Sequence, residues 1–287
     1  MKQKDRNGKL IDQPNGQDRM LKVLYGSVPG RVVLKLLVSP VISRIAGVFL
    51  SSRLSVPLIK PFVQKNHIDF SQFAPGPYPN YNEFFSRKIR PELRPVDMDP
   101  THLISPCDSK LTVLPISSES RFMLKHTPYT VASLLKNEVL ARKYEGGTAM
   151  IFRLTVDDYH RYCYMADGVK EDNVRIPGVL HTVNPIANDV YPIYKENARE
   201  YSILHTEHFG DVLMMEVGAL LVGKIVNHHG STRVKRGQEK GYFQFGGSTV
   251  VLLLEKERAV IDSDILENSQ QGIEMVVRMG EKIGSAK

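Results

Sequence analysis

The stretch Gly241-Tyr242-Phe243-Gln244-Phe245-Gly246-Gly247-Ser248-Thr249-Val250-Val251-Leu252-Leu253-Leu254 does most to decide the fold of this chain. Its two apolar runs, residues 241–245 and 250–254, have the length and the aromatic and β-branched content of strands. The Gly-Gly-Ser-Thr between them suits a bulge or a tight bend. We therefore expect two strands that meet at residues 246–249, with Ser248 at the junction.

Similar short apolar runs, bounded by glycine, proline or charged residues, recur from about residue 101 onward. One stretch differs, because residues 130–143 read as a single helix with Val131, Leu134, Leu135 and Val139 on one face. The chain from residue 101 to residue 287 is therefore predicted to form a β-rich domain in an α+β fold. The further predicted strands are 111–113, 149–152, 212–217 and 220–222.

The N-terminal part of the chain has a different character. Residues 1–18 are polar and read as a flexible tail, and residues 19–100 as a helical segment and its connector. The apolar part of this segment contains Lys35 and Arg44 and is interrupted by Pro40, so it fails the requirements of a membrane-spanning helix. Two short helices fit better, and they suit either a membrane interface or a packed helical core.

The same N-terminal segment is also expected to contain a short helix within Tyr81-Asn82-Glu83-Phe84-Phe85-Ser86-Arg87-Lys88-Ile89-Arg90. Its two phenylalanines would be buried, and Arg87, Lys88 and Arg90 would be exposed on a solvated face.

Composition narrows the class of function. The chain has 287 residues, a formal charge of +7 and a pI of about 9.2. Its two cysteines, Cys107 and Cys163, are too few for a disulfide framework or a sulfur-rich zinc site, and no metal is expected. No nucleic-acid-binding motif accompanies the basic charge, which therefore favours an anionic membrane as partner.

Taken alone, Gly246-Gly247-Ser248-Thr249 is ordinary turn chemistry. It also permits a reaction, because the Ser248 hydroxyl lies next to the Gly247 carbonyl along the chain and glycines allow unusual backbone angles. Attack would turn the peptide into an ester, and elimination followed by hydrolysis would leave a ketone in place of the serine amine. Such a group can act as an electron sink for an amino substrate.

This reaction needs a base, and several side chains are candidates. Asp108 lies in Ser105-Pro106-Cys107-Asp108, His160 in Asp158-Tyr159-His160-Arg161, and His181 after Val179-Leu180. Each also fits a structural role, as does the pair His228-His229, which fits a solvated loop. The order Asp, His, Ser is compatible with a catalytic triad, but order along a chain does not establish geometry.

Four sequence pieces together resemble those of the phosphatidylserine decarboxylase family. They are Ser105 to Asp108, Asp158 to Arg161, Val217-Gly218-Ala219-Leu220-Leu221-Val222-Gly223, and the run from Lys235 to Phe243 that leads into Gly246 to Thr249. The similarity covers roughly residues 60–256. Each piece is weak alone, and the set is specific.

The resemblance implies a pyruvoyl-dependent, self-processing enzyme of phospholipid biosynthesis. It would convert phosphatidylserine to phosphatidylethanolamine and CO2 through a Schiff base with a pyruvoyl group made from Ser248. Cleavage after Gly247 would give a β chain of residues 1–247 and an α chain of residues 248–287. Asp108 would orient and polarise a histidine during maturation, and His160 would handle a proton during decarboxylation.

The resemblance also implies a place in the cell. The enzyme would be peripheral at the cytoplasmic side of a bacterial cell membrane, with the N-terminal helices at the anionic lipid surface. It leaves open whether the chain forms a homodimer.

Three positions depart from the family pattern. Many relatives carry a second histidine, usually the self-cleavage base, where this chain has Cys163. Cysteine acts as a base only as a thiolate, so either His160 does both jobs or His181 is the substitute. Gly246 stands in place of a leucine, and Ser109 in place of a glycine.

Three other functions compete with this one. A self-processing enzyme could act on a soluble amino acid, or the chain could be a non-catalytic membrane-binding protein in which Gly-Gly-Ser is a plain turn. A serine hydrolase is disfavoured because the Gly-x-Ser-x-Gly nucleophile elbow is absent around Ser248.

Overall fold

The core of the protein is one 11-stranded sheet, which is antiparallel except where β1 pairs with β18. The computed structural model describes residues 2–11, 24–37, 39–119, 121–124, 127–181, 193–219, 224–244 and 248–287. In order across the sheet the strands are β14 (Thr232–Val234), β9 (Gly168–Lys170), β11 (Arg199–Thr206), β12 (Gly210–Val217), β16 (Ser248–Leu254), β7 (Thr148–Leu154), β4 (Ser109–Pro115), β18 (Glu274–Val277), β1 (Gln3–Lys4) and β2 (Leu10–Ile11), with β10 (Val174–Ile176) paired to β11.

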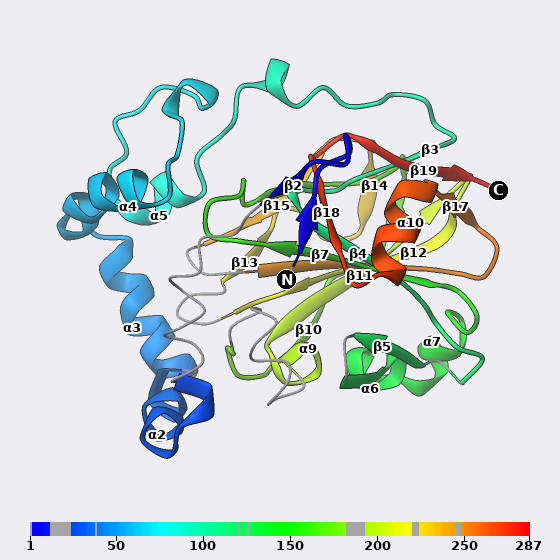
Figure 1. Ribbon diagram of the computed structural model, residues 1–287, viewed down its shortest axis with the longest axis horizontal. Coiled ribbons are helices and arrows are strands. Elements are labelled where there is room, and N and C mark those ends of the chain that lie inside the picture. The colour runs from blue at the N-terminus through cyan, green and yellow to red at the C-terminus, as the bar shows by residue number, and fades with distance from the viewer. Residues whose placement is uncertain are drawn as a thin grey trace.

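Smaller sheets and short helices surround this large sheet (Figure 1). The three smaller sheets are β13 (Ile225–Asn227), β15 (Glu239–Phe243) and β8 (Arg161–Cys163); β17 (Ala259–Ile261), β19 (Lys282–Ala286) and β3 (His102–Ile104); and β5 (Arg121–Leu124) with β6 (Thr127–Thr130). The described helices in this part of the chain are α6 (Val131–Leu135), α7 (Glu138–Arg142), α9 (Ile193–Glu196) and α10 (Ser263–Gln270).

The two faces of the large sheet are buried against different partners. Alternate residues of β16, such as Val250 and Leu252, pack with Tyr162 and Phe243 of the β13-β15-β8 sheet, and we name this the small-sheet face. The residues between them, such as Val251, pack with α6 and α7 on what we name the helix face. Burial on both faces explains why these strands read as continuous apolar runs rather than alternating ones.

The strands predicted from residues 111–113, 149–152, 212–217 and 250–254 are confirmed as parts of β4, β7, β12 and β16. The predicted strand 241–245 is observed as β15, which begins at Glu239 and ends at Phe243. Residues 220–222 lie outside the described residues, as do Phe245, Gly246 and Gly247.

The single helix predicted for residues 130–143 is wrong, because the chain forms two short helices, α6 and α7. Lys136 ends α6 in the left-handed region, with φ of 50°. Asn137 then begins α7, since its Oδ1 accepts a hydrogen bond from the Leu140 N–H at 3.0 Å. The break rotates Val139 out of the core, and its side chain is 83% exposed.

The first residues of the chain, expected to belong to a flexible tail, are part of the sheet. Gln3 and Lys4 of β1 pair in parallel with β18. Arg6 follows them and forms ion pairs with Asp262 and Asp264 at the start of α10. Backbone pairing and these charges therefore tie residues 2–11 to the C-terminal part of the chain.

The N-terminal helical segment lies along one side of the molecule (Figure 1). As predicted, Pro40 separates two helices, α2 (Val28–Leu37) and α3 (Pro40–Leu50), and it occupies the first turn of α3, where a missing N–H costs nothing. The short helices η1 (Arg53–Leu58), α4 (Ile59–Lys65), η2 (Phe70–Gln72), α5 (Tyr81–Phe85) and η3 (Pro91–Leu93) follow.

Within the described residues, no single helix is long and apolar enough to cross a membrane. One pair, Val41–Leu50 with Arg53–Lys65, meets the criteria of length and composition together, but the two helices are bent by 87° at their junction.

Candidate functional site

Ser248 is the first residue of β16, and its side chain is completely buried. It shares the small-sheet face with Val250 and Leu252, because every second residue of a strand points the same way. Its Oγ has no hydrogen-bond partner among the described residues. A buried hydroxyl without a partner is costly and calls for an explanation.

The strand register brings further residues to the same edge of the sheet. Ser248 pairs with Leu154 at the end of β7, and the next pair along β7 is Arg153 with Lys110 of β4. The end of β7, the start of β4 and the start of β16 therefore meet. Asp108, directly before β4, and the connection that follows β7 both lie at this edge.

That connection, residues 155–160, is held by a buried ion pair. The Asp158 carboxylate accepts hydrogen bonds from the Thr155 N–H at 2.7 Å and from the Lys110 Nζ at 2.6 Å. Lys110 also donates to the Thr155 hydroxyl at 2.7 Å. Burial raises the pKa of Asp158, and the Lys110 ammonium opposes that shift. The network fixes the turn that delivers His160.

His160 ends this connection and is completely buried. Its Nδ1 lies 2.9 Å from the carbonyl oxygen of Asp158. A carbonyl only accepts, so Nδ1 carries the proton and Nε2 keeps a free lone pair. Burial lowers the pKa of His160 to about 3, which keeps the ring neutral at physiological pH. Nε2 has no partner among the described residues.

Two contacts fix the position of His160. The Phe85 ring of α5 packs on the imidazole, with 4.2 Å between ring centroids. The Phe243 N–H at the end of β15 donates to the His160 carbonyl at 2.9 Å. Four residues separate Phe243 from Ser248 along the chain, so the segment that leads into Ser248 starts beside His160.

Asp108 has a different set of partners from the one expected. The Arg94 guanidinium donates to both its oxygens, with Nε at 2.8 and 3.0 Å, and the Met279 N–H donates to Oδ1 at 2.9 Å. Asp108 is buried at the same edge as His160, but the hydrogen bond that orients His160 comes from the Asp158 backbone.

His181 is associated with the other face of the sheet. Its Nδ1 lies 3.4 Å from the hydroxyl of Tyr25, which packs in the helix-face cluster. Its Nε2 lies 3.7 Å from a carboxylate oxygen of Glu196. Burial lowers the pKa of His181. The residue is thus a buried histidine with partners of its own on the helix face of the sheet.

Cys163, which stands where a second histidine was expected, is buried in β8. Burial raises the pKa of its thiol to about 12. A general base at this position would need a thiolate, and a pKa well above neutrality keeps the thiol protonated. His160 is therefore the better-placed base of the two.

Two residues of the site were missed by sequence reasoning. Lys110 gave a visible signal, because it lies two residues after Asp108, and residues two apart in an extended chain point to the same face. Arg94 gave no signal, since it belongs to a connector distant from any motif. The described residues contain no group of three or more His, Cys, Asp or Glu placed to hold a metal ion.

The chemical capacity of this edge follows from its two unpaired groups. A serine hydroxyl needs an acceptor, and a neutral imidazole nitrogen needs a donor. Both are buried in the small-sheet half of the core, where an unmet hydrogen bond costs about 1–3 kcal/mol. Ser248 Oγ and His160 Nε2 do not hydrogen-bond to each other in this structure; a histidine that comes within hydrogen-bond reach of a serine hydroxyl activates the oxygen as a nucleophile.

Comparison with known proteins agrees with the sequence resemblance. The family model described as "Phosphatidylserine decarboxylase" matches residues 81–285. A protein of Clostridium acetobutylicum named "Phosphatidylserine decarboxylase proenzyme 2" is 49% identical over 94% of this chain and 92% of its own length. A protein of Clostridium novyi named "Phosphatidylserine decarboxylase proenzyme" is 40% identical over 93% of each chain. A protein of Ruminiclostridium cellulolyticum with the same name is 40% identical over 96% of this chain and 93% of its own length.

Proposed function

The chain belongs to the phosphatidylserine decarboxylase family, and we propose that Ser248 and His160 carry out the self-cleavage that activates it. As a member of that family the protein is a carboxy-lyase of phospholipid biosynthesis, which releases CO2 from phosphatidylserine and leaves phosphatidylethanolamine. The relatives are named proenzymes, which agrees with a precursor that is processed into two chains.

The buried, unpaired hydroxyl of Ser248 carries this proposal. His160 Nε2 accepts the hydroxyl proton, and Oγ attacks the Gly247 carbonyl, so that the peptide bond becomes an ester. Loss of the Ser248 α-proton then expels the Gly247 carboxylate and leaves a dehydroalanine residue. Water releases ammonia from that residue, and the new chain begins with a pyruvoyl group. Every atom comes from the chain and one water.

The residues present fit such a group. Ser248 is its precursor, and the completely buried position gives it a dry environment in which charge interactions are strong. When formed, the pyruvoyl group supplies an electron sink for the carbon that loses CO2. His160, neutral and free at Nε2, holds or delivers the proton that replaces CO2. Lys110 and Asp158 keep the histidine in place.

The proposed role of Asp108 is positional. Its carboxylate ties Arg94 and the Met279 backbone to the edge at which β4 begins. The sequence-based expectation that it polarises a histidine stays a prediction, as does the alternative that His181 is the maturation base.

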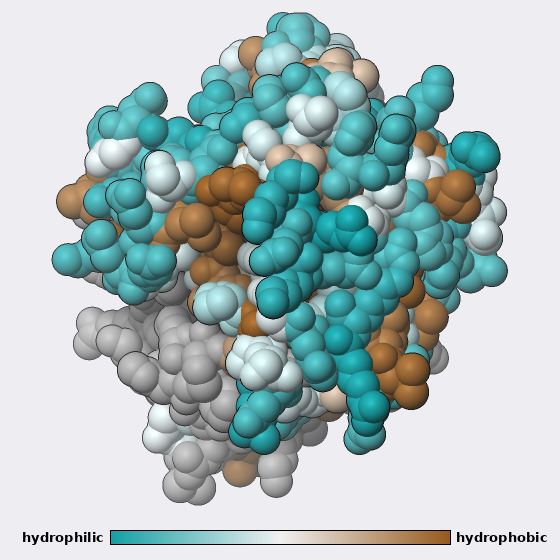
Figure 2. Space-filling view, turned by 90° about the vertical axis from the view of Figure 1, so that its right-hand side faces the viewer, coloured by the Kyte–Doolittle hydropathy of each residue, from teal (hydrophilic) through white to brown (hydrophobic). Residues whose placement is uncertain are grey.

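The N-terminal helices are proposed to bind the bilayer that contains the lipid substrate. Val41, Ile45 and Val48 form one exposed stripe on α3, at 63, 66 and 70% exposure, and Leu54 of η1 is 77% exposed. Residues 28–65 contain no Asp or Glu. An apolar stripe flanked only by basic charge suits an anionic lipid surface. The face seen in Figure 2, on the other side of the molecule, is mostly hydrophilic.

We propose that the protein is peripheral at the cytoplasmic side of a bacterial membrane; the apolar stripe and the basic charge support only its place at a lipid surface. The function is tested by assaying CO2 release from phosphatidylserine in mixed micelles and from free serine. Turnover of the lipid, and its loss in S248A, is the expected result. Turnover of free serine alone would favour the competing soluble-substrate function.

A further inference from the structure

Arg87 lies two residues after α5 and was expected on a solvated face, but the structure buries it to 3% exposure. Its neighbours Lys88 and Arg90 are exposed as expected. The Arg87 guanidinium lies over the Phe73 ring, 4.1 Å from its centroid, and over the Phe84 ring at 4.8 Å. The burial therefore places a cation inside an aromatic cluster.

Most of the hydrogen-bonding capacity of this cation is unused. Nη1 donates to the Phe84 carbonyl at 3.3 Å, whereas Nε and Nη2 are buried without a partner among the described residues. Burial lowers the pKa of Arg87 to about 10, so the side chain keeps its charge at neutral pH. Ring faces attract a guanidinium, but they leave its in-plane N–H groups free. A buried charge without an anion is costly.

The two free N–H groups form a planar fork, which is the geometry that binds a carboxylate or a phosphate through two hydrogen bonds. No ion pair of the described residues satisfies this fork. Asp157 and the hydroxyls of Tyr78 and Tyr159 act on the charge of Arg87 only through space. The described residues therefore leave this buried fork without an anion.

Arg87 adjoins the candidate active site. Phe85, two residues earlier, packs against the His160 ring at 4.2 Å, and the charge of Arg87 contributes to the lowered pKa of His160. Phe73 contacts Tyr159, the residue before His160, with 6.5 Å between ring centroids. The anion that Arg87 binds would thus lie beside the site.

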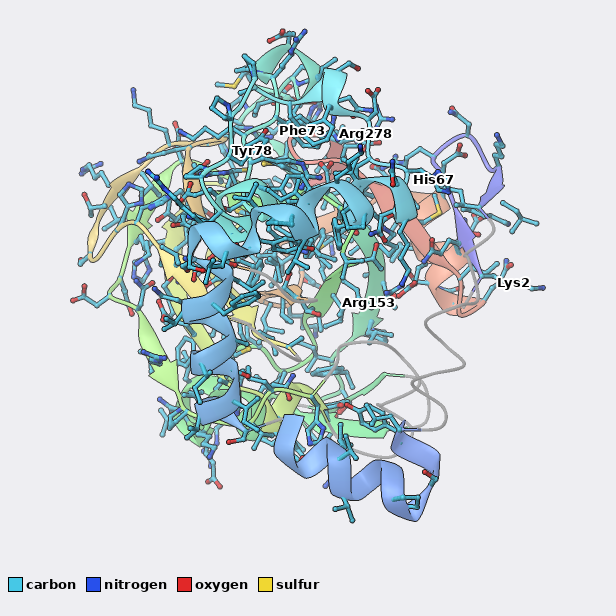
Figure 3. The ribbon with its side chains drawn as sticks, turned by 90° about the vertical axis from the view of Figure 1, so that its left-hand side faces the viewer. Lys2, His67, Phe73, Tyr78, Arg153 and Arg278 are labelled. Carbon is cyan, nitrogen blue, oxygen red and sulfur yellow. The ribbon has the colours of Figure 1, made fainter. Side chains whose placement is uncertain are left out.

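The other side of the cluster faces the N-terminal helices. Phe84 and Phe85 pack with Leu50 of α3 and with Tyr81 in one buried cluster. Figure 3 labels Phe73, whose ring lies under the Arg87 guanidinium, and Tyr78, which packs against this cluster, and shows α3 on the same side of the molecule. Arg87 is therefore joined through Phe84 to the cluster that contains Leu50 of α3 and through Phe73 to Tyr159, next to His160.

We propose that Arg87 binds the phosphodiester of phosphatidylserine. The inference rests on the proposed function and follows the order of groups in the lipid: acyl chains at α3 and η1, phosphodiester at Arg87, and serine headgroup at Ser248. The substrate carboxylate is the other anion available. A cation that binds it would stabilise the ground state more than the transition state, because that charge disappears as CO2 leaves.

The test compares wild type, R87Q and R87K with R90Q, an exposed arginine of the same segment, as the matched control. Self-cleavage and thermal unfolding of each full-length chain report folding independently of lipid. We expect the R87Q chain to cleave itself normally. Its KM for phosphatidylserine in mixed micelles should rise by about tenfold or more, because the charged hydrogen bonds between Arg87 and the phosphodiester are lost. Its kcat should change by less than about threefold, since the phosphodiester is unchanged by the reaction.

R87K keeps the charge without the planar fork, and its KM should lie between those of wild type and R87Q. R90Q should match wild type. An R87Q enzyme that processes normally with unchanged KM would overturn the proposal. Where R87Q fails to fold, the KM of R87K decides, and a wild-type value there would overturn it as well.

Soluble inhibitors separate the two anions. Glycerophosphoethanolamine has the phosphodiester and no carboxylate, and its inhibition should weaken in R87Q. Serine, which has the carboxylate alone, should inhibit both enzymes alike. The opposite pattern would assign Arg87 to the carboxylate and refute the proposal. A wild-type protein that processes but never turns over phosphatidylserine would refute the proposed function instead, which keeps the two failures distinct.

Discussion

At the scale of single residues, the site depends on the ionisation of His160. Its Nδ1–H is committed to the Asp158 carbonyl, and its burial keeps the ring neutral, so one nitrogen remains as a base. The same burial raises the pKa of Cys163 and removes it as a competitor. Burial in a low-dielectric environment thus has opposite consequences for two side chains three residues apart. It keeps His160 neutral and able to act as a base, and it keeps the Cys163 thiol protonated.

Substitution of His160 should therefore stop maturation. We expect H160N to slow self-cleavage of the purified precursor by about 10²- to 10⁴-fold, the range for loss of a general base. A time course of chain cleavage on denaturing gels measures the effect.

C163S and H181N are the matched comparisons for H160N. C163S should cleave at close to the wild-type rate, because a thiol with a pKa of about 12 is protonated at neutral pH. If H181N stops cleavage while H160N does not, His181 is the base and our assignment fails.

The pKa of His160 also predicts how stability depends on pH. The folded value of about 3 lies below the value of about 6.5 for an unfolded histidine. The neutral ring thus stabilises the fold fully above pH of about 6.5, and that stability is lost as the pH falls toward the folded pKa. Each pH unit in this window costs up to about 1.4 kcal/mol.

Urea unfolding of the uncleaved S248A chain at pH 7, 5.5 and 4.5 measures this dependence. The S248A/H160N double variant provides the reference, because it contains every other titrating group. A smaller loss of unfolding free energy in the double variant is expected. Equal losses in both would show that His160 titrates normally.

At the scale of elements, the exposed stripe of α3 and η1 is the feature that separates a lipid enzyme from a soluble one. Deletion of residues 1–60 would be a poor test, because it would also remove β1 and its pairing with β18. Single acidic substitutions on the stripe leave the sheet intact.

We expect I45E/V48E to weaken sedimentation with anionic liposomes and to lower lipid turnover, while self-cleavage continues at the wild-type rate. Both side chains are more than half exposed, so the change costs little folding energy. V139E, which places the same charge at an 83% exposed position on α7, is the control. Equal liposome binding by all three proteins would contradict a membrane role for α3.

At the scale of the whole molecule, the sequence predicted what depends on local pattern. The strands on either side of Ser248 and the helix break at Pro40 follow from apolar runs and from proline chemistry, which act over a few residues. The Asp158 to Arg161 piece likewise located His160. These features can be predicted without knowing which residues pack against them.

Features that depend on distant contacts were not predictable in this way. Arg87 reads as one more basic residue among Lys88 and Arg90, and only the packing of Phe73 against α5 buries it. Gln3 and Lys4 look like a polar tail, and β18 makes them a strand. The helix expected over residues 130–143 is interrupted at Lys136. The side chain of the next residue, Asn137, caps the start of α7, and this hydrogen bond competes with continuation of the first helix.

The chain assembles its site from widely separated segments, with α5, the β7–β8 connection and the start of β16 meeting at one edge of the large sheet. The central claim is that this assembly turns Ser248 into a pyruvoyl group. Intact mass of the purified protein is the direct measurement. We predict two chains, residues 1–247 and 248–287, the second lighter than its encoded mass by one ammonia, and a single uncleaved, inactive chain for S248A. A wild-type protein that decarboxylates phosphatidylserine as one intact chain, or an active S248A, would contradict the claim.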